Sequence, residues 1–164
     1  MRFLRGCALF ATGLFVGSLG MQSLIAQQNR QTNHRINHVG VRASDFQQSL
    51  DFYTKVLGFK VAYKFPGPEG MPTTTELQVN KDTFVELAPP APNQPAGLTH
   101  FAIYTDNADA TVAQFRRAGA MVDDATLRSN TGAKVSGVMD PNGIRIEILE
   151  LPADSPMRKA LDAY

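Results

Sequence analysis

The same order of elements occurs twice along this chain, and this internal repeat restricts its fold more than any other feature. Residues 35–90 are predicted to form a strand, a helix and three further strands, and residues 97–152 repeat that order. Between them, the segment 89–97 (PPAPNQPAG) is too rich in proline for a strand or a helix. A supersecondary unit that recurs in this way is typical of similar modules packed together. The sequence therefore predicts one α+β domain, residues 35–152, built from two βαβββ modules.

The individual elements follow from the spacing of apolar residues. Alternating apolar residues indicate strands, and apolar residues at every third or fourth position indicate helices. The first helix is expected to begin at the capping box Ser44–Gln47 and to end at Gly58. The predicted strands cover 35–43, 59–65, 73–80 and 83–88 in the first module and 98–105, 121–128, 134–139 and 143–151 in the second, whose helix covers 108–118.

Two histidines and two glutamates keep the period of the repeat. His38 and His100 lie 62 residues apart, each on the first strand of its module, and Glu86 and Glu147 lie 61 apart, each on the last. Because successive side chains of a strand point to opposite faces, the apolar neighbours of these residues show which face each one takes. All four are predicted to lie on the face opposite the apolar side chains that the helices cover, and they converge if the sheet curves.

Two imidazoles and two carboxylates suit a divalent ion of the Ni, Co, Zn, Fe or Mn group and leave positions for a substrate. The alternative is a pair of partly buried histidines and a pair of solvated carboxylates with no ion. The recurrence of the same residue types at the same positions of both modules favours the metal site.

The first 26 residues have the pattern of a secretory signal peptide. Arg2 and Arg5 precede a stretch without charged residues that ends only at Arg30, and Ala26 closes a plausible cleavage site. We expect an exported protein, periplasmic or secreted, with a short tail at 27–34 before the domain. If the segment is not cleaved, it is the chain's one expected membrane contact. Cleavage also removes Cys7, the only cysteine, which excludes a thiol nucleophile.

The charge balance of the chain bears on its partners, and the C-terminal segment has the pattern of a helix. Sixteen basic and fifteen acidic residues are present and no Lys/Arg block occurs, so a nucleic-acid surface is not expected and a small-molecule substrate is. At 153–164, Ser155 and Pro156 have the pattern of a helix start, and Met157 and Leu161 share one face. This tail helix is predicted to cover a core edge or a partner subunit.

Four segments, NHVGVRASDFQQSLDFYTKVLGFKV, FVEL, THFAIYTDNADATVAQFRRAGA and DPNGIRIEILEL, resemble the vicinal oxygen chelate superfamily. This superfamily includes glyoxalase I, methylmalonyl-CoA epimerase, fosfomycin-resistance thiol transferases, extradiol dioxygenases and bleomycin-resistance proteins. The similarity runs from Ile36 to Leu151. It implies curled, mostly antiparallel sheets around a central metal cleft, often completed in a homodimer.

Within the superfamily, the four residues match the ligand set of bacterial glyoxalase I, a lyase. The resemblance implies one divalent ion, with Ni, Co or Zn ahead of Fe or Mn, held by His38, Glu86, His100 and Glu147. It also implies a substrate with two adjacent oxygens that reacts through an enediolate. Glu147 is the first candidate for the carboxylate that moves the proton, and Glu86 is the second candidate or a fixed ligand.

The substrate is less well defined by the resemblance. Arg42 matches the glyoxalase arginine that binds the glutamyl end of glutathione, but Pro90 stands where that family has an asparagine. Tyr104 is a further candidate for substrate binding because it shares a face with His100. Two alternatives remain open: an extradiol-type dioxygenase or thiol transferase using the same metal site, and a non-catalytic binding protein of the bleomycin-resistance type.

Overall fold

The computed structural model describes residues 34–66 and 73–164 of the chain. The expected signal peptide and nearly all of the tail at 27–34 lie outside these residues. Within the described part, no helix has the length and apolar character needed to cross a membrane. Its elements are β1 (Arg35–Arg42), α2 (Phe46–Asp51), η1 (Phe52–Val56), β2 (Lys60–Phe65), β3 (Thr74–Asn80), β4 (Thr83–Ala88), β5 (Gly97–Tyr104), α3 (Ala108–Arg117), β6 (Thr126–Leu127), β7 (Lys134–Met139), β8 (Arg145–Glu150) and α4 (Pro156–Asp162).

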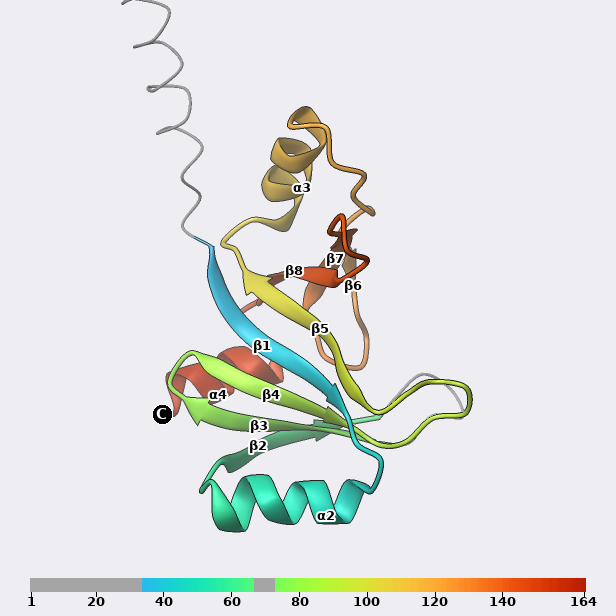
Figure 1. Cartoon of the computed structure of the whole chain (residues 1–164). Coiled ribbons are helices and arrows are strands. Elements are labelled where there is room, and N and C mark those ends of the chain that lie inside the picture. Colours follow the sequence, from blue (N-terminus) through green and yellow to red (C-terminus); the bar gives the residue numbers. More distant parts are fainter. Residues whose placement is uncertain (1–33, 67–72) are drawn as a thin grey trace, which may run out of the picture. The chain divides into compact units, whose positions relative to one another are not determined.

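The two modules share one curled, eight-stranded sheet with the order β2-β3-β4-β1-β5-β8-β7-β6 (Figure 1). Each module contributes four neighbouring strands, and the antiparallel pair β1–β5 joins the modules. Counted outward from this pair, the two modules have the same strand order. Only β1–β4 and β5–β8 pair in parallel. The α+β fold of two βαβββ modules with mostly antiparallel strands is therefore confirmed.

Each module covers the outer face of its part of the sheet with its own helix. Phe46 and Leu50 of α2 pack on Leu77 and Leu87, in the order that the helical spacing predicts. In the second module, α3 forms a separate cluster in which Val112 and Phe115 pack around Ile148. The faces predicted to be apolar are thus the ones that the module helices bury.

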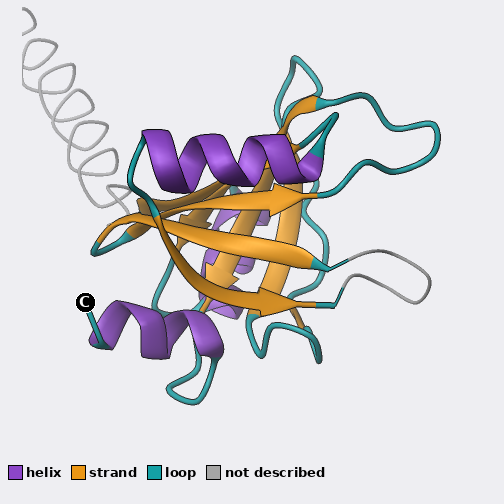
Figure 2. Ribbon diagram, turned by 90° about the horizontal axis from the view of Figure 1, so that it is seen from below, coloured by secondary structure: helices purple, strands orange, loops and turns teal. Residues whose placement is uncertain are grey.

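The opposite face, called here the inner face, carries the even-numbered side chains of β4 and β5, and α4 covers part of it. Met157 and Leu161 pack there with Phe84, Ala102 and Leu149. Ser155 caps the helix by accepting a hydrogen bond from the backbone N–H of Arg158 at 3.3 Å. The predicted tail helix is present, and Figure 2 shows it across the strands from α2.

Two sequence-based boundaries were wrong. The side chain of Asp45, not Ser44, accepts the capping hydrogen bond of α2, from Gln48 at 3.0 Å. The strand predicted at 121–128 is reduced to the two residues of β6 and an isolated bridge at Val122. Arg116 of α3 donates to the carbonyl of Val122 at 3.0 Å and so ties this segment to the helix.

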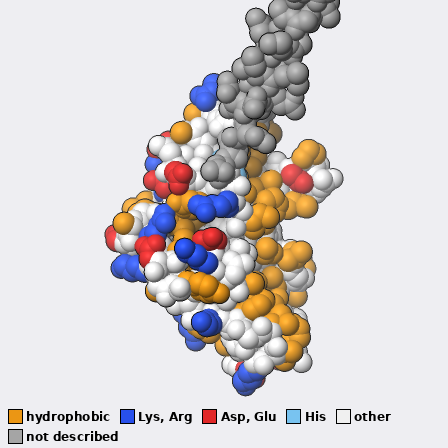
Figure 3. Space-filling model, turned by 90° about the vertical axis from the view of Figure 1, so that its left-hand side faces the viewer, with side chains coloured by type: hydrophobic (Ala, Val, Ile, Leu, Met, Phe, Trp, Pro, Cys, Tyr) orange, Lys and Arg blue, Asp and Glu red, His pale blue; other side chains and the backbone are white. Residues whose placement is uncertain are grey.

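The surface combines mixed charge with exposed apolar side chains. Acidic and basic side chains are interspersed over the face in Figure 3, and hydrophobic ones gather along one side of it. The most exposed large hydrophobic residues of the described part are Met121, Leu98, Val56 and Leu127.

Candidate metal centre

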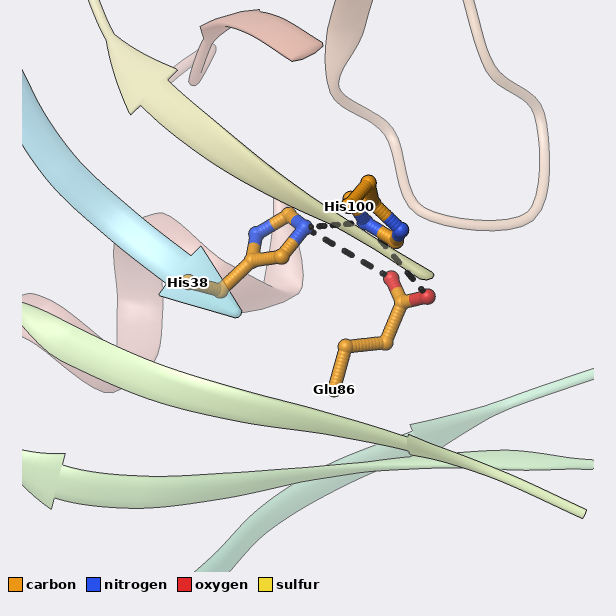
Figure 4. A group of neighbouring side chains, drawn as sticks. All are labelled: His38, Glu86 and His100. Carbon is orange, nitrogen blue, oxygen red and sulfur yellow. Dashed lines mark hydrogen bonds and ion pairs between the residues drawn. The ribbon is translucent and has the colours of Figure 1, made fainter. Parts of the chain in front are cut away.

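The four residues that keep the repeat lie on the four central strands of the sheet. Glu86, His38, His100 and Glu147 belong to β4, β1, β5 and β8, which are consecutive neighbours. All four side chains lie on the inner face. Figure 4 shows His38, Glu86 and His100 pointing toward one another. The sequence prediction that these residues converge is thus matched by their positions.

The donor atoms of His38, Glu86 and His100 lie within 4.8 Å of one another, close enough to share one ion, and Glu147 adds a carboxylate near both histidines. The Nε2 atoms of His38 and His100 are 2.9 Å apart. Oε2 of Glu86 lies 3.9 Å from Nε2 of His38, and its Oε1 lies 3.9 Å from Nε2 of His100. Oε2 of Glu147 lies 3.9 Å from Nε2 of His38 and 3.8 Å from Nε2 of His100. Ligands of one ion, each at about 2.0–2.2 Å from it, lie roughly 3.0–3.6 Å apart. Small side-chain adjustments would bring the donor atoms of His38, Glu86 and His100 into that range.

Small residues make this convergence possible. A Cβ atom on Gly40 would lie 2.2 Å from the ring of His100, so the imidazole occupies space that any other residue would fill. Gly40 is the Cα partner of His100 across the β1–β5 pair, and Ala102 is the partner of His38. Each histidine therefore faces a small residue on the strand of the other module. Sequence reasoning missed Gly40, because its role depends on register between distant segments.

Each imidazole has a hydrogen-bond partner at Nδ1, the ring nitrogen that does not face the other histidine. Nδ1 of His38 is 3.0 Å from Oδ1 of Asn37, and Nδ1 of His100 is 2.9 Å from the hydroxyl of Thr99. A bond from Nδ1–H to the oxygen of Asn37 leaves the Nε2 lone pair of His38 facing the cluster. Metal-binding histidines typically have such a partner on the ring nitrogen that does not bind the ion.

Burial keeps the histidines neutral. Burial, followed by the nearby His100, lowers the pKa of His38 to about 3. Burial is also the main cause that lowers the pKa of His100. In the other direction, burial and the charge of Glu147 raise the pKa of Glu86 to about 7. Neutral imidazoles beside crowded carboxylates are a donor set that a divalent cation would stabilise, so the residues present fit a metal ion.

A third glutamate, which sequence reasoning missed, lies behind Glu86. Glu76 on β3 is the Cα partner of Glu86 and is 1% exposed. Burial and the charge of Glu86 raise the pKa of Glu76 well above its ordinary value. The polar residues Thr74, Glu76 and Gln78 alternate along β3 as they do on a solvated strand face, so the sequence carried no signal for burial.

Two arginines approach the cluster from its rim. The positive charge of Arg42 offsets part of the rise in the pKa of Glu86 and adds to the lowering of the pKa of His100 by burial. Its Nε is buried without a hydrogen-bond partner among the described residues. Arg145, not predicted from sequence, places Nε 3.3 Å from Oε1 of Glu147. Its guanidinium lies over Gly137, where a Cβ atom would come within 2.8 Å of it. The two oxygens of Glu147 therefore have different neighbours, Arg145 and the histidines.

A cavity of about 830 Å³ opens onto Glu86 and Glu147. The segment 127–131 and Phe65 with Pro66 form its other walls, and Asn130 donates to the carbonyl of Pro66 at 3.1 Å. Segments of both modules thus enclose a space large enough for a small-molecule substrate.

Tyr104 lies apart from this cavity. Its hydroxyl donates to Asp106 at 3.1 Å and accepts from Arg158 at 2.6 Å. It lines a separate cavity of about 220 Å³ together with Arg35 and Lys81. Of the residues expected at the site, the four proposed ligands lie on the inner face of the four central strands, the charge of Arg42 reaches Glu86 and His100, and Tyr104 lies elsewhere.

Comparisons with known proteins show the family and the fold of the chain. A lactoylglutathione lyase from Escherichia coli O157:H7 is 33% identical over 132 residues, which cover 71% of this chain and 92% of that protein. An uncharacterized protein, YwkD, from Bacillus subtilis is 26% identical over 122 residues, covering 70% and 95% of the two chains. A Streptomyces coelicolor methylmalonyl-CoA epimerase has the same fold, with a TM-score of 0.64 at 23% identity over 73% of this chain and 98% of that one. The profile of the Glyoxalase/Bleomycin resistance protein/Dioxygenase superfamily matches residues 35–148, and the chain belongs to that superfamily.

Proposed function

We propose that this chain is a metal-dependent lyase or isomerase of the glyoxalase I type. The observation that carries the proposal is the convergence of two neutral histidines and two glutamates, Glu86 and Glu147, at the wall of an open cavity. A lactoylglutathione lyase among the relatives supports the same type of reaction. The substrate is a small molecule with two adjacent oxygens, which undergoes proton transfer between neighbouring carbons.

His38, His100 and Glu86 hold the ion in this proposal, and Glu147 completes the set. A divalent ion, with Ni, Co or Zn ahead of Fe or Mn, supplies a Lewis acid that polarises the two oxygens of the substrate. Glu147 takes the proton from one carbon and returns it to the next. Its Oε2 faces the histidines while Oε1 lies against the half-buried Arg145, so its carboxylate has a partner on either side. Glu86 is the second candidate for this role.

Arg42 is the proposed contact for an anionic part of the substrate. Its buried Nε has no partner among the described residues, and a carboxylate of the substrate would provide one. Arg128 lines the large cavity and offers a cation there. Glutathione, named for the relatives, is therefore one candidate for the thiol part of the substrate. Tyr104 is left out because it faces the other cavity.

Elemental analysis and an activity assay test the proposal together. Protein purified without chelator should contain about one divalent metal per chain, on the basis of one four-residue site. It should also convert the hemithioacetal of glutathione and a 2-oxoaldehyde into a thioester, followed by ultraviolet absorbance. The His38→Ala/His100→Ala variant should lose both properties. A wild-type chain that neither contains nor takes up Ni, Co, Zn, Fe or Mn would contradict the proposal and favour the non-catalytic binding protein.

The Glu86 carboxylate is what favours this reaction over the alternatives on the same site. The resemblance assigns only the equivalents of His38, His100 and Glu147 to dioxygenases and thiol transferases. Here Glu86 is placed as close to both histidines as Glu147 is. We therefore favour a site that includes Glu86 beside the two histidines.

A further inference from the structure

The cavity of about 220 Å³ beside Tyr104 has no part in the proposed function. It lies between the start of β1, the β3–β4 turn, the end of β5 and α4. Its lining contains three basic and two acidic side chains, those of Arg35, Lys81, Arg158, Asp82 and Asp162. An excess of positive charge in a concave space favours a negatively charged occupant.

Tyr104 brings two of the three cations together. The guanidinium carbons of Arg35 and Arg158 each lie 5.5 Å from the centre of its ring, a distance at which an aromatic face attracts a cation. The Tyr104 hydroxyl also accepts a hydrogen bond from Nη2 of Arg158 at 2.6 Å. Two like charges held beside one ring repel each other, and an anion bound to both would offset that repulsion.

The basic side chains of this cavity form no ion pair with a carboxylate among the described residues. The Lys and Arg side chains that do so lie elsewhere, at Lys55, Arg116, Lys134 and Arg145. Asp82 and Asp162 thus line the cavity beyond ion-pair distance of its cations. The guanidinium groups are therefore available to a ligand carboxylate or phosphate, which arginine binds through two parallel hydrogen bonds.

A buried amide completes the lining. Asn37 is 2% exposed and lines the cavity. Its Oδ1 lies 3.0 Å from Nδ1 of His38, so its amide N–H groups are the donors that it can offer to a ligand. Because a buried polar group is costly without hydrogen bonds, a ligand that accepts from this amide would be favoured. The volume is below the roughly 300–1,000 Å³ of sites for drug-sized ligands, so the ligand must be small.

We propose that this cavity binds a small oxyanion, a carboxylate or phosphate compound, at a site distinct from the candidate metal centre. The guanidinium groups of Arg35 and Arg158 bind its oxygens, and the amide of Asn37 donates a further hydrogen bond. Tyr104 holds the two arginines in place. This ligand is not the substrate of the proposed reaction, because the cavity of about 830 Å³ is the one that opens onto the proposed carboxylate ligands.

Isothermal titration of the full-length chain with inorganic phosphate and with malate, at low ionic strength, tests this site. Arg158→Gln removes one guanidinium group. Lys159→Gln is the matched control, because it removes the same charge from the next residue of α4, which does not line the cavity. His100→Ala removes a proposed metal ligand and so detects binding of a probe at the metal centre. Vesicles with and without phosphatidic acid distinguish a free oxyanion from a lipid headgroup of the same chemistry.

Loss of a hydrogen bond between charged groups should weaken binding about tenfold or more. We expect that loss in Arg158→Gln, and wild-type affinity in Lys159→Gln and His100→Ala. If Arg158→Gln does not fold, Arg35→Gln gives the same reading, because Arg35 is exposed at the start of β1.

Binding of the soluble probes alone supports a site for a free compound, and Arg158-dependent attachment to phosphatidic acid vesicles supports the same site for a headgroup. Equal affinity of Arg158→Gln and Lys159→Gln would overturn the inference. So would an equal loss in His100→Ala, or no binding of either probe by the wild-type chain at millimolar concentration.

Discussion

At the scale of single residues, the candidate site depends on two glycines, which leave space for larger side chains, as well as on the proposed ligands. The imidazole of His100 lies over Gly40, and the guanidinium of Arg145 lies over Gly137. Neither contact could be predicted from the sequence, because each joins residues on different strands whose register is not visible in the chain. The four proposed ligands could be predicted, since their repeat and their strand alternation are local patterns.

Gly40→Ala should disrupt the metal site while leaving most of the fold intact. The new methyl group would lie 2.2 Å from the His100 ring, so the ring must turn away from His38. We expect metal affinity to fall by about 100-fold or more, approaching that of His100→Ala, as for a ligand moved off its position. Competition titration with a chelator measures the loss, and thermal unfolding checks the fold. Unchanged affinity would show that this ring position is not needed.

The pH dependence of metal binding should reflect Glu86. Burial and the charge of Glu147 raise the pKa of this carboxyl to about 7, so below that pH a cation must displace its proton. Metal affinity should therefore fall as the pH drops below about 7, by up to roughly tenfold per pH unit for one proton. The pKa of His38, lowered to about 3 by burial and His100, keeps that imidazole neutral over this range.

Glu86→Gln should remove this pH dependence and also weaken binding at pH 8. Isothermal titrations with Zn²⁺ between pH 5.5 and 8 would measure both effects. Glu150→Gln is the control, because the Glu150 carboxylate accepts a hydrogen bond from the backbone N–H of Ala108 and is not a proposed ligand. Metal binding and activity that survive unchanged in Glu86→Gln would favour the three-ligand dioxygenase or thiol-transferase alternative.

At the scale of elements, the sequence predicts what is periodic and misses what is held by irregular contacts. The strands at 83–88 and 134–139 were predicted with the bounds that the structure has, since apolar alternation defines them. Residues 121–128 alternate as well, but Arg116 holds Val122 and Asp124 beside α3, and only β6 forms a regular strand pair. The amphipathic pattern of α4 predicted a covering role but not which surface it covers.

Met157 of α4 tests how far this helix supports the inner face. Its side chain is 3% exposed and lines the small cavity that also contacts Glu86 and Glu147. Met157→Ala should lower the free energy of unfolding by about 2–5 kcal/mol, as for other buried large-to-small changes. The exposed Lys159→Ala on the same helix should stay within about 0.5 kcal/mol of wild type. Urea unfolding followed by circular dichroism compares them, and equal stability of both variants would mean that α4 is not part of the core.

At the scale of the whole molecule, the pairing of β1 with β5 decides where the site is built. This antiparallel pair joins the modules within one chain, so β4, β1, β5 and β8 bring all four proposed ligands from a single copy. The homodimer and the export of the chain, expected from the resemblance and from residues 1–26, remain predictions. Exposed apolar residues such as Leu98 and Met121 are available for a subunit contact that does not have to complete the site.

Mixing two defective chains would distinguish a site within one chain from a site shared between two. His38→Ala and His100→Ala each remove one proposed ligand, from β1 and from β5. If each chain forms its own site, no combination of the two variants contains a complete set, and a refolded equimolar mixture should bind no more metal than either variant alone. If the modules instead paired between subunits, a mixed dimer would regain one intact site.

The variants are unfolded together in urea, refolded, and titrated with Zn²⁺ beside wild-type protein treated in the same way. Sedimentation of the same samples reports whether dimers are present. Recovery of tight binding in the mixture would contradict the single-chain arrangement, whereas binding that stays at the level of the separate variants is what the β1–β5 pairing predicts.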